Sequence, residues 1–156
     1  MGYSKERMFL IKKNYGECSM KKIVIDINIL MDFLFKREGH EKTAEIFRIC
    51  LKGDIKGFIC AHEITTLFYF LNKTVKDKLK IRKSLSCIIN RFEIIEVNAE
   101  ILNKALTSEI SDYEDAVIEV SSAGKKAEYI LTRNTKDFKK SIVNAITPEE
   151  LLALLN

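Results

Sequence analysis

The stretch KKIVIDINILMDFLF, residues 21–35, decides the fold because it combines a buried strand with a carboxylate at the end of that strand. Ile23, Val24 and Ile25 form a continuous apolar run, which is typical of strands in a parallel sheet covered on both faces. Asp26 follows where such a strand ends inside the protein. Burying a lone carboxylate costs several kcal/mol, so the sequence predicts that another group compensates Asp26.

Apolar runs alternate with helical patterns along the rest of the chain. Short runs rich in Ile, Val and Phe predict strands at residues 22–26, 57–60, 92–97, 128–132 and 142–146. Helices are predicted at 40–51, 62–73, 75–90, 99–110 and 111–124, and a last one begins near Pro148. Ser111 and Glu114 have the spacing of a capping box for the helix that ends at Gly124. This alternation indicates an α/β domain with a central parallel sheet of about five strands and helices on both faces.

Composition indicates one soluble domain. The chain has 156 residues, of which 47% are hydrophobic and 31% charged, and no low-complexity tract or linker separates a second domain. Residues 1–19 are interpreted as a poorly ordered extension, or as residues from an upstream start, before a domain at 20–156. No apolar run is long enough to span a membrane, and the cysteines are scattered, so we expect a cytoplasmic protein with reduced cysteines in its core. The net charge of +4 permits nucleic acid as a partner without requiring it.

Four acidic residues fall where a parallel sheet places ligands, beyond the carboxyl ends of its strands. Asp26 and Asp137 follow predicted strands. Asp112 and Asp115 lie in the first turns of the helix that leads into the fourth strand. Two carboxylates about 4 Å apart repel by roughly 4 kcal/mol at an effective dielectric of about 20, so protonation or a divalent cation must relieve a cluster. Oxygen ligands without nearby His or Cys favour Mg²⁺ or Mn²⁺, and such an ion activates water for phosphodiester hydrolysis. The pattern therefore predicts a nuclease.

Each acid also has a structural interpretation. The helix dipole stabilises Asp112 and Asp115 near a helix N-terminus, whether or not they bind a ligand. Asp137 is compatible with a turn, and Asp32 is interpreted as solvated helix surface. A purely structural role is least convincing for Asp26, because a buried strand end leaves few reasons other than function for a carboxylate.

Two motifs resemble the PIN domain family. VIDINIL, residues 24–30, resembles its opening signature, and DYEDAVIEVSSAGKKAEYILTRNTKDF, residues 112–138, resembles its second half in the branch with a DxxDA helix. TPEELL at 147–152 also fits that branch, so the resemblance covers residues 20–156. It implies a compact three-layer α/β/α fold with a central parallel sheet. It also implies a Mg²⁺- or Mn²⁺-dependent endoribonuclease that hydrolyses RNA and, as in many bacterial and archaeal members, a toxin that an antitoxin partner holds inactive.

The resemblance implies roles for residues of this chain. Catalysis falls to three acids, Asp26, Asp115 and Asp137. The implied metal ligands are Asp26, Asp112, Asp115, Asp137, Asn134 and Glu63. Contacts with the substrate are expected from Asn28, Thr132, Arg133 and Lys136, the last two because basic side chains bind phosphates.

Two positions depart from the family pattern. Asn134 stands where the family usually has an acid, which keeps an oxygen ligand but removes a negative charge. The family's acid on the helix after the second strand falls at Thr66 here, with Glu63 one turn earlier. Either Glu63 serves through a shifted helix start, or this acid is missing. A catalytically silent PIN domain that only binds RNA or protein is therefore an alternative to the enzyme.

Other classes of protein fit less well. A haloacid-dehalogenase-like phosphatase needs a second Asp two residues after the first, where this chain has Asn28. A phosphoacceptor receiver domain needs paired acids near its first strand and a Lys at a later strand end, and that pattern is absent. HEITTLFYFL, residues 62–71, is apolar on every side, and such a helix is buried in the core or against another chain. We therefore expect a homodimer or an antitoxin contact there.

Overall fold

The computed structural model describes residues 20–155, so the predicted extension at 1–19 lies outside the described residues. Its centre is a sheet of five parallel strands in the order β3-β2-β1-β4-β5. The strands are β1 (Lys21–Ile25), β2 (Ile55–Cys60), β3 (Glu93–Ile95), β4 (Tyr129–Leu131) and β5 (Asn144–Ile146). The predicted parallel sheet of about five strands is thus confirmed. The strand order reverses between β1 and β4, and ligands of open α/β sheets bind beyond the strand ends at such a point.

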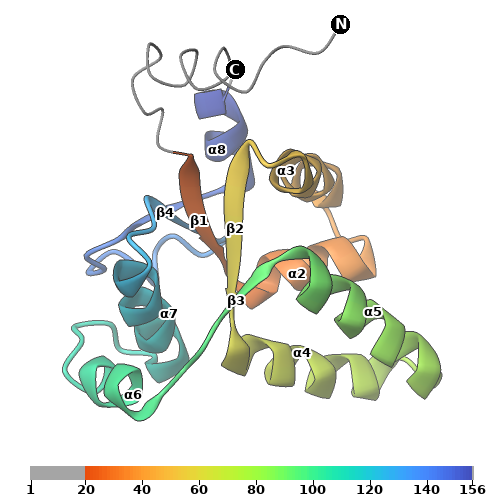
Figure 1. The fold of residues 1–156 in the computed structure, drawn as a ribbon, viewed down its shortest axis with the longest axis horizontal. Coiled ribbons are helices and arrows are strands. Elements are labelled where there is room, and N and C mark those ends of the chain that lie inside the picture. The colour runs from red at the N-terminus through yellow and green to blue at the C-terminus, as the bar shows by residue number, and fades with distance from the viewer. Residues whose placement is uncertain (1–19, 156) are drawn as a thin grey trace, which may run out of the picture.

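Helices cover both faces of the sheet (Figure 1). They are α2 (Ile27–Phe35), α3 (His40–Lys52), α4 (Ala61–Thr74), α5 (Lys78–Arg91), α6 (Ala99–Ala105), α7 (Tyr113–Gly124) and α8 (Pro148–Leu155). Buried side chains of α2, α3, α4, α5 and α8 join one hydrophobic cluster, and those of α6 and α7 join another on the opposite face. The three-layer α/β/α arrangement is therefore confirmed. None of the helices within residues 20–155 is both long and apolar enough to cross a membrane.

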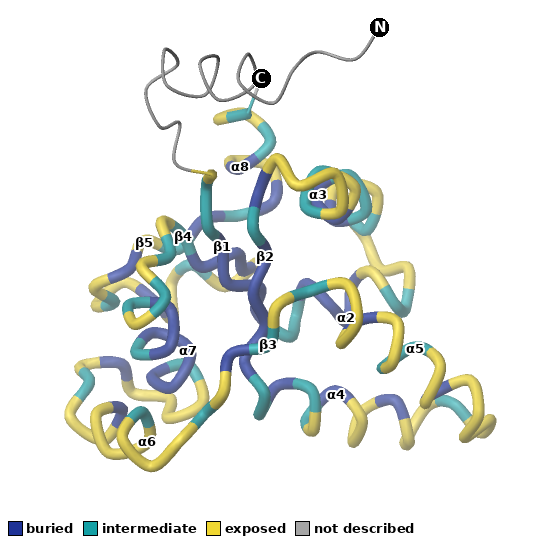
Figure 2. Tube along the Cα trace, viewed as in Figure 1, coloured by how far each residue is buried: buried dark blue, intermediate teal, exposed yellow. Residues whose placement is uncertain are grey.

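The side chains of β1 alternate between the two clusters. Ile23 and Ile25 belong to the first, Val24 belongs to the second, and all three are fully buried. Figure 2 shows the same burial along the central strands, with the exposed residues concentrated on the outer helices and loops. Because β1 is covered on both faces, the residue that follows it is delivered into the interior. That residue is Asp26, which is 3% exposed.

The structure corrects three predictions. Asp32, interpreted as solvated helix surface, is only 1% exposed, because Arg133 from the segment after β4 packs on its carboxylate. The predicted capping box of Ser111 and Glu114 is wrong, since α7 begins one residue later with Asp112 as its N-cap. Cys87, expected in the core, is exposed on α5.

Close packing beside β2 predicts a selective effect of alanine at Gly57. A Cβ there would lie 3.0 Å from Cδ1 of Phe92 and 3.2 Å from Sγ of Cys50. Gly57→Ala is expected to lower the free energy of unfolding by about 1–3 kcal/mol, because overpacking forces the neighbours to shift. Gly124→Ala is the matched control, since no atom lies within 4 Å of the added Cβ at the end of α7. Urea unfolding of both variants measures this, and an equal loss at the two sites would contradict it.

Candidate functional site

Asp26 lies at the C-terminal end of β1, where hydrogen bonds hold its carboxylate in place. Its Oδ2 accepts from the Thr132 hydroxyl at 2.6 Å and from the Asn28 amide at 3.3 Å. Its backbone N–H donates to the carbonyl of Leu131, at the end of β4, over 3.0 Å. Burial raises the pKa of Asp26, and the bonds from Thr132 and Asn28 partly oppose that rise. The carboxylate is therefore fixed at the point where the strand order reverses, in surroundings that disfavour its charge.

Glu63 brings a second buried carboxyl to this point. It lies in the first turn of α4, is 2% exposed, and completes a capping box by accepting from the Cys60 N–H at 3.4 Å. Its other oxygen accepts from the Ile27 N–H at 2.6 Å, so the side chain ties the end of β2 to the start of α2. Burial, followed by the charge of Asp26, raises the pKa of Glu63 well above its usual range. The sequence leaves Glu63 and Thr66 as the two positions for the second acid. The structure brings the carboxyl of Glu63 within electrostatic range of Asp26.

Asp115 adds a third acid from the first turn of α7. It is half-buried, and its N–H donates to Oδ1 of Asp112, the N-cap residue, over 3.1 Å. Burial is the largest cause that raises the pKa of Asp115 to about 7. The charges of Asp26, Asp112 and Asp137 raise it further, in that order. The four predicted aspartates therefore interact electrostatically, although they come from segments far apart in the sequence.

A cavity of about 310 Å³ opens among α2, α4 and α7. Its polar lining consists of Asp26, Asn28, His62, Glu63, Thr66, Asp112, Glu114 and Asp115. The sequence alone does not identify His62 or Glu114 as residues of the site. The only signal for them is that they are adjacent in sequence to Glu63 and Asp115. The Thr66 hydroxyl donates to Glu114 at 3.0 Å, and both ring nitrogens of His62 are buried without a hydrogen-bond partner among the described residues. Burial lowers the pKa of His62, so the ring favours its neutral form.

Asn134 and Asp137 lie on the segment that follows β4, outside the lining of this cavity. Asn134 donates its N–H to the Thr132 hydroxyl at 3.0 Å, and its carbonyl accepts from the N–H of Asp137 at 3.0 Å. Both residues are exposed, as are Arg133 and Lys136. Asp137 is nevertheless close enough to the cluster for its charge to act on Asp115. The predicted residues thus divide into a group that lines the cavity and an exposed group on this segment.

The cluster has the charge and the ligand type of a site for a hard divalent cation. No Lys or Arg within residues 20–155 forms an ion pair with Asp26, Glu63 or Asp115, so no cationic side chain there neutralises the cluster. In the same part of the chain, no group of three His, Cys, Asp or Glu side chains is arranged to hold a metal ion. The residues therefore fit such an ion by chemistry and not as a preformed coordination shell.

The raised pKa of Asp115 predicts that the metal-free protein loses stability as the pH rises. Folded Asp115 releases its proton at about pH 7, whereas an unfolded aspartate does so near 3.8. Between these values the folded state binds more protons than the unfolded state, so the free energy of unfolding falls with increasing pH. The contribution of Asp115 to this fall ends once the pH exceeds its folded pKa of about 7.

Thermal unfolding in EDTA from about pH 4 to about pH 8 measures this slope. We expect Asp115→Asn to make it smaller, with part remaining because burial also raises the pKa of Asp26 and Glu63. Asp54→Asn, in the exposed turn before β2, is the control and should leave the slope unchanged. A slope of equal size in the parent and in Asp115→Asn would contradict the prediction.

Comparisons with known proteins agree with the fold. A family model described as PIN domain matches residues 22–136. Ribonuclease VapC1 of Aquifex aeolicus (strain VF5) is 27% identical over 136 residues, which are 83% of this chain and 92% of that protein. A toxin–antitoxin complex from Klebsiella pneumoniae is similar in structure, with a TM-score of 0.60 and 26% identity, over 81% of this chain and 97% of that chain. VapBC2 from Rickettsia felis, bound to a DNA fragment from the promoter, has a TM-score of 0.66 at 18% identity. The similarity covers 81% of this chain and 98% of that chain. Since the family model spans most of the sequence, this chain belongs to the PIN domain family.

Proposed function

We propose that this chain is a Mg²⁺- or Mn²⁺-dependent endoribonuclease. The observation that carries the proposal is the cluster of Asp26, Glu63 and Asp115, whose negative charge has no Lys or Arg partner within the described residues. Carboxyls with strongly raised pKa values beside a cavity are more frequent at functional sites than elsewhere. Membership of the PIN domain family and the similarity to Ribonuclease VapC1 support the same activity.

Each predicted residue has a part in this proposal. A bound ion would supply an activated water and a counter-charge for the phosphodiester. Thr132 and Asn28 orient the Asp26 carboxylate through their hydrogen bonds. Glu63 has both oxygens bonded to backbone N–H groups, so its main part is to fix the ends of β2 and α2. The side chains proposed to hold the ion are Asp26, Asp112, Asp115, Asp137, Asn134 and Glu63.

RNA fits the charges on the segment after β4. Lys136, Lys139 and Lys140 are exposed there, close in sequence to Asp137. Lysines of this kind bind phosphates in a salt-dependent manner that does not depend on base sequence. We propose that Lys136 and its neighbours contact the RNA backbone. Arg133 differs from them because its Nε already pairs with Asp32 at 2.7 Å.

A protein partner is proposed for the outer face of α4. Phe68 and Tyr69 are 44% and 55% exposed, so the described part of the chain does not bury the apolar helix on all sides, whereas Phe70 lines the cavity beside the acids. A contiguous exposed apolar surface marks a site of protein interaction. One similar structure is a toxin–antitoxin complex. We propose that this chain is the toxin of such a pair and that this face binds the antitoxin, with a homodimer as the other occupant.

A catalytically silent PIN domain is the second candidate. Asn134 leaves the expected set one charge short, and no three potential ligand side chains in residues 20–155 form a ready metal site. A silent domain would keep its binding of RNA or protein without metal-dependent cleavage. The two candidates therefore differ in whether RNA is cut.

Incubation with single-stranded RNA and Mn²⁺ or Mg²⁺ tests the enzyme. We expect cleavage that EDTA abolishes. Asp26→Asn should reduce it by about 100-fold or more, since loss of an outer partner of a metal site alone costs roughly 10- to 100-fold. Asp54→Asn, remote from the site, should retain the parent's rate. Tight RNA binding by the parent without any cleavage would support the silent domain instead.

Restoring an acid at position 134 predicts tighter metal binding. Asn134→Asp adds a negative charge on the segment that carries Asp137, and a carboxylate attracts a hard divalent ion more strongly than an amide does. Calorimetric titration with Mn²⁺ above pH 7 should therefore give a lower Kd than for the parent. Asn103→Asp, the same change at an exposed position of α6, should leave the Kd unaltered. An unchanged Kd for Asn134→Asp would place position 134 outside the metal site.

A further inference from the structure

Asp32 is a buried carboxylate within α2, and it lies outside the acid cluster. It is 1% exposed, and its Oδ2 lies 2.7 Å from Nε of Arg133. Its Oδ1 lies 3.9 Å from Nη1 of Arg37, which is a looser contact. Removing one partner from a buried ion pair is strongly unfavourable, because the other charge is left uncompensated. The short contact therefore holds Arg133 against α2.

Arg133 stands between two residues of the candidate site. Thr132, just before it, donates its hydroxyl proton to Asp26 and accepts the N–H of Asn134 at 3.0 Å. The pairs Asp26–Thr132 and Asp32–Arg133 thus join α2 to consecutive residues of the segment after β4. Two successive attachments fix both the position and the direction of the chain as it leaves the strand.

The segment beyond Arg133 has few other attachments. It forms consecutive turns, in which the N–H of Asp137 bonds to the carbonyl of Asn134, and residues 133, 134, 136 and 137 are exposed. The chain is buried again at Phe138, which is 3% exposed. The location of Asn134 and Asp137 relative to the acid cluster therefore depends on the anchors at the two ends.

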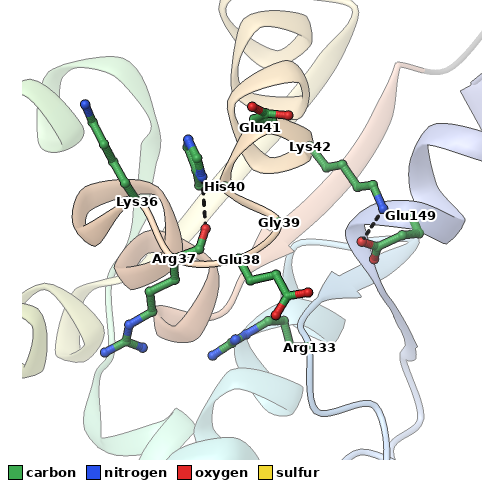
Figure 3. Close-up of a pocket in the computed structure, with 9 residues that line it drawn as sticks. All are labelled: Lys36, Arg37, Glu38, Gly39, His40, Glu41, Lys42, Arg133 and Glu149. Atoms are coloured by element: carbon green, nitrogen blue, oxygen red, sulfur yellow. Dashed lines mark hydrogen bonds and ion pairs between the residues drawn. The ribbon is translucent and has the colours of Figure 1, made fainter.

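Arg37 and Arg133 also line a cavity of about 670 Å³ between the α2–α3 loop, α8 and the segment after β4 (Figure 3). The permanent cations of its lining are Lys36, Arg37, Lys42 and Arg133. Its carboxylates are Glu38, Glu41 and Glu149, and Glu149 pairs with Lys42 at 2.8 Å. Together with Asp32 beneath the arginines, the opposite charges balance, so the cavity lacks the positive excess of a phosphate site. The place of Arg133 calls for a different explanation.

We propose that Asp32 and Arg133 are a positioning pair that holds residues 133–137 so that Asp137 stays within electrostatic range of Asp115 and Asn134 stays against Thr132. The inference rests on the proposed nuclease function and adds to it a residue that the sequence alone places on the surface. Neither member of the pair touches the metal or the reacting phosphate. Both act through the segment that carries the ligands, as outer partners of metal sites do.

A positioning role and a phosphate-binding role of Arg133 predict different kinetics. In the positioning role, Arg133→Gln and Asp32→Asn share one effect, a lower kcat and weaker Mn²⁺ binding with little change in KM. In the phosphate-binding role, Arg133→Gln raises the KM for RNA, whereas Asp32→Asn frees the guanidinium and does not weaken RNA binding.

The experiment compares the parent with Asp32→Asn, Arg133→Gln and the control Arg37→Gln. The control removes an arginine that faces the same carboxylate at 3.9 Å but belongs to the α2–α3 loop. The measurements are Mn²⁺ titration of the metal-free protein, hydrogen exchange of residues 133–138 by mass spectrometry, and steady-state cleavage of RNA. In both pair variants we expect the Kd for Mn²⁺ to rise about 10- to 100-fold. We expect kcat to fall by about 10- to 100-fold and residues 133–138 to exchange faster. Arg37→Gln should stay within about twofold of the parent.

The outcomes separate the pair from the nuclease activity. Unchanged Mn²⁺ affinity and unchanged exchange in Arg133→Gln, whose side chain is 43% exposed and not needed for the core, overturn the positioning pair. A lower melting temperature without a change confined to residues 133–138 also overturns it. If the parent does not cut RNA but both variants loosen this segment and weaken Mn²⁺ binding, the pair stands and the nuclease proposal fails.

Discussion

The hydrogen bond from the Thr132 hydroxyl to the Asp26 carboxylate is the interaction on which the site depends. It is buried and 2.6 Å long, and it joins the ends of β1 and β4, where the strand order reverses. The same hydroxyl accepts the N–H of Asn134, and the N–H of Thr132 bonds to Ile146 on β5 at 3.0 Å. Through its side chain and its backbone, this one residue therefore links the C-terminal ends of β1, β4 and β5. Threonine suits the position because its hydroxyl donates and accepts at once and its branched Cβ favours extended backbone.

The buried carboxylate before α2, Asp26, and the one within it, Asp32, have opposite surroundings. Asp32 has the guanidinium of Arg133 at 2.7 Å, whereas Asp26 is hydrogen-bonded by neutral donors and faces further acids. Pairing is the usual way to tolerate a buried charge, and the chain uses it for one residue only. Asp26 is held in place but left without a counter-charge, at the expense of local stability. A carboxylate in that condition is suited to receive a cation from solution.

Features encoded locally could be predicted from the sequence, and features decided by distant contacts could not. The continuous apolar run before Asp26 identified a strand covered on both faces, so the burial of the next residue followed from position alone. Asp32 is charged and lies near the end of α2, and its partner Arg133 lies in another part of the chain, so local pattern placed it on the surface. Ser111 and Asp112 are equally suitable N-cap residues, and only the backbone bonds that form in the folded chain select Asp112. The acids of the site were recognisable by their places at strand and helix ends, but the side chains that close the cavity around them were not.

The bond between Asp26 and Thr132 links residues separated by 106 positions, and this sets the order in which the domain can mature. The chain is synthesised from its N-terminus, so β1 and β2 leave the ribosome long before β4 does. Contacts between distant segments also form late in folding, because a long loop must close before they contribute. A partly synthesised chain therefore carries some of the acids without the threonine that organises them. The cluster can therefore take its final geometry only after Thr132 has been translated.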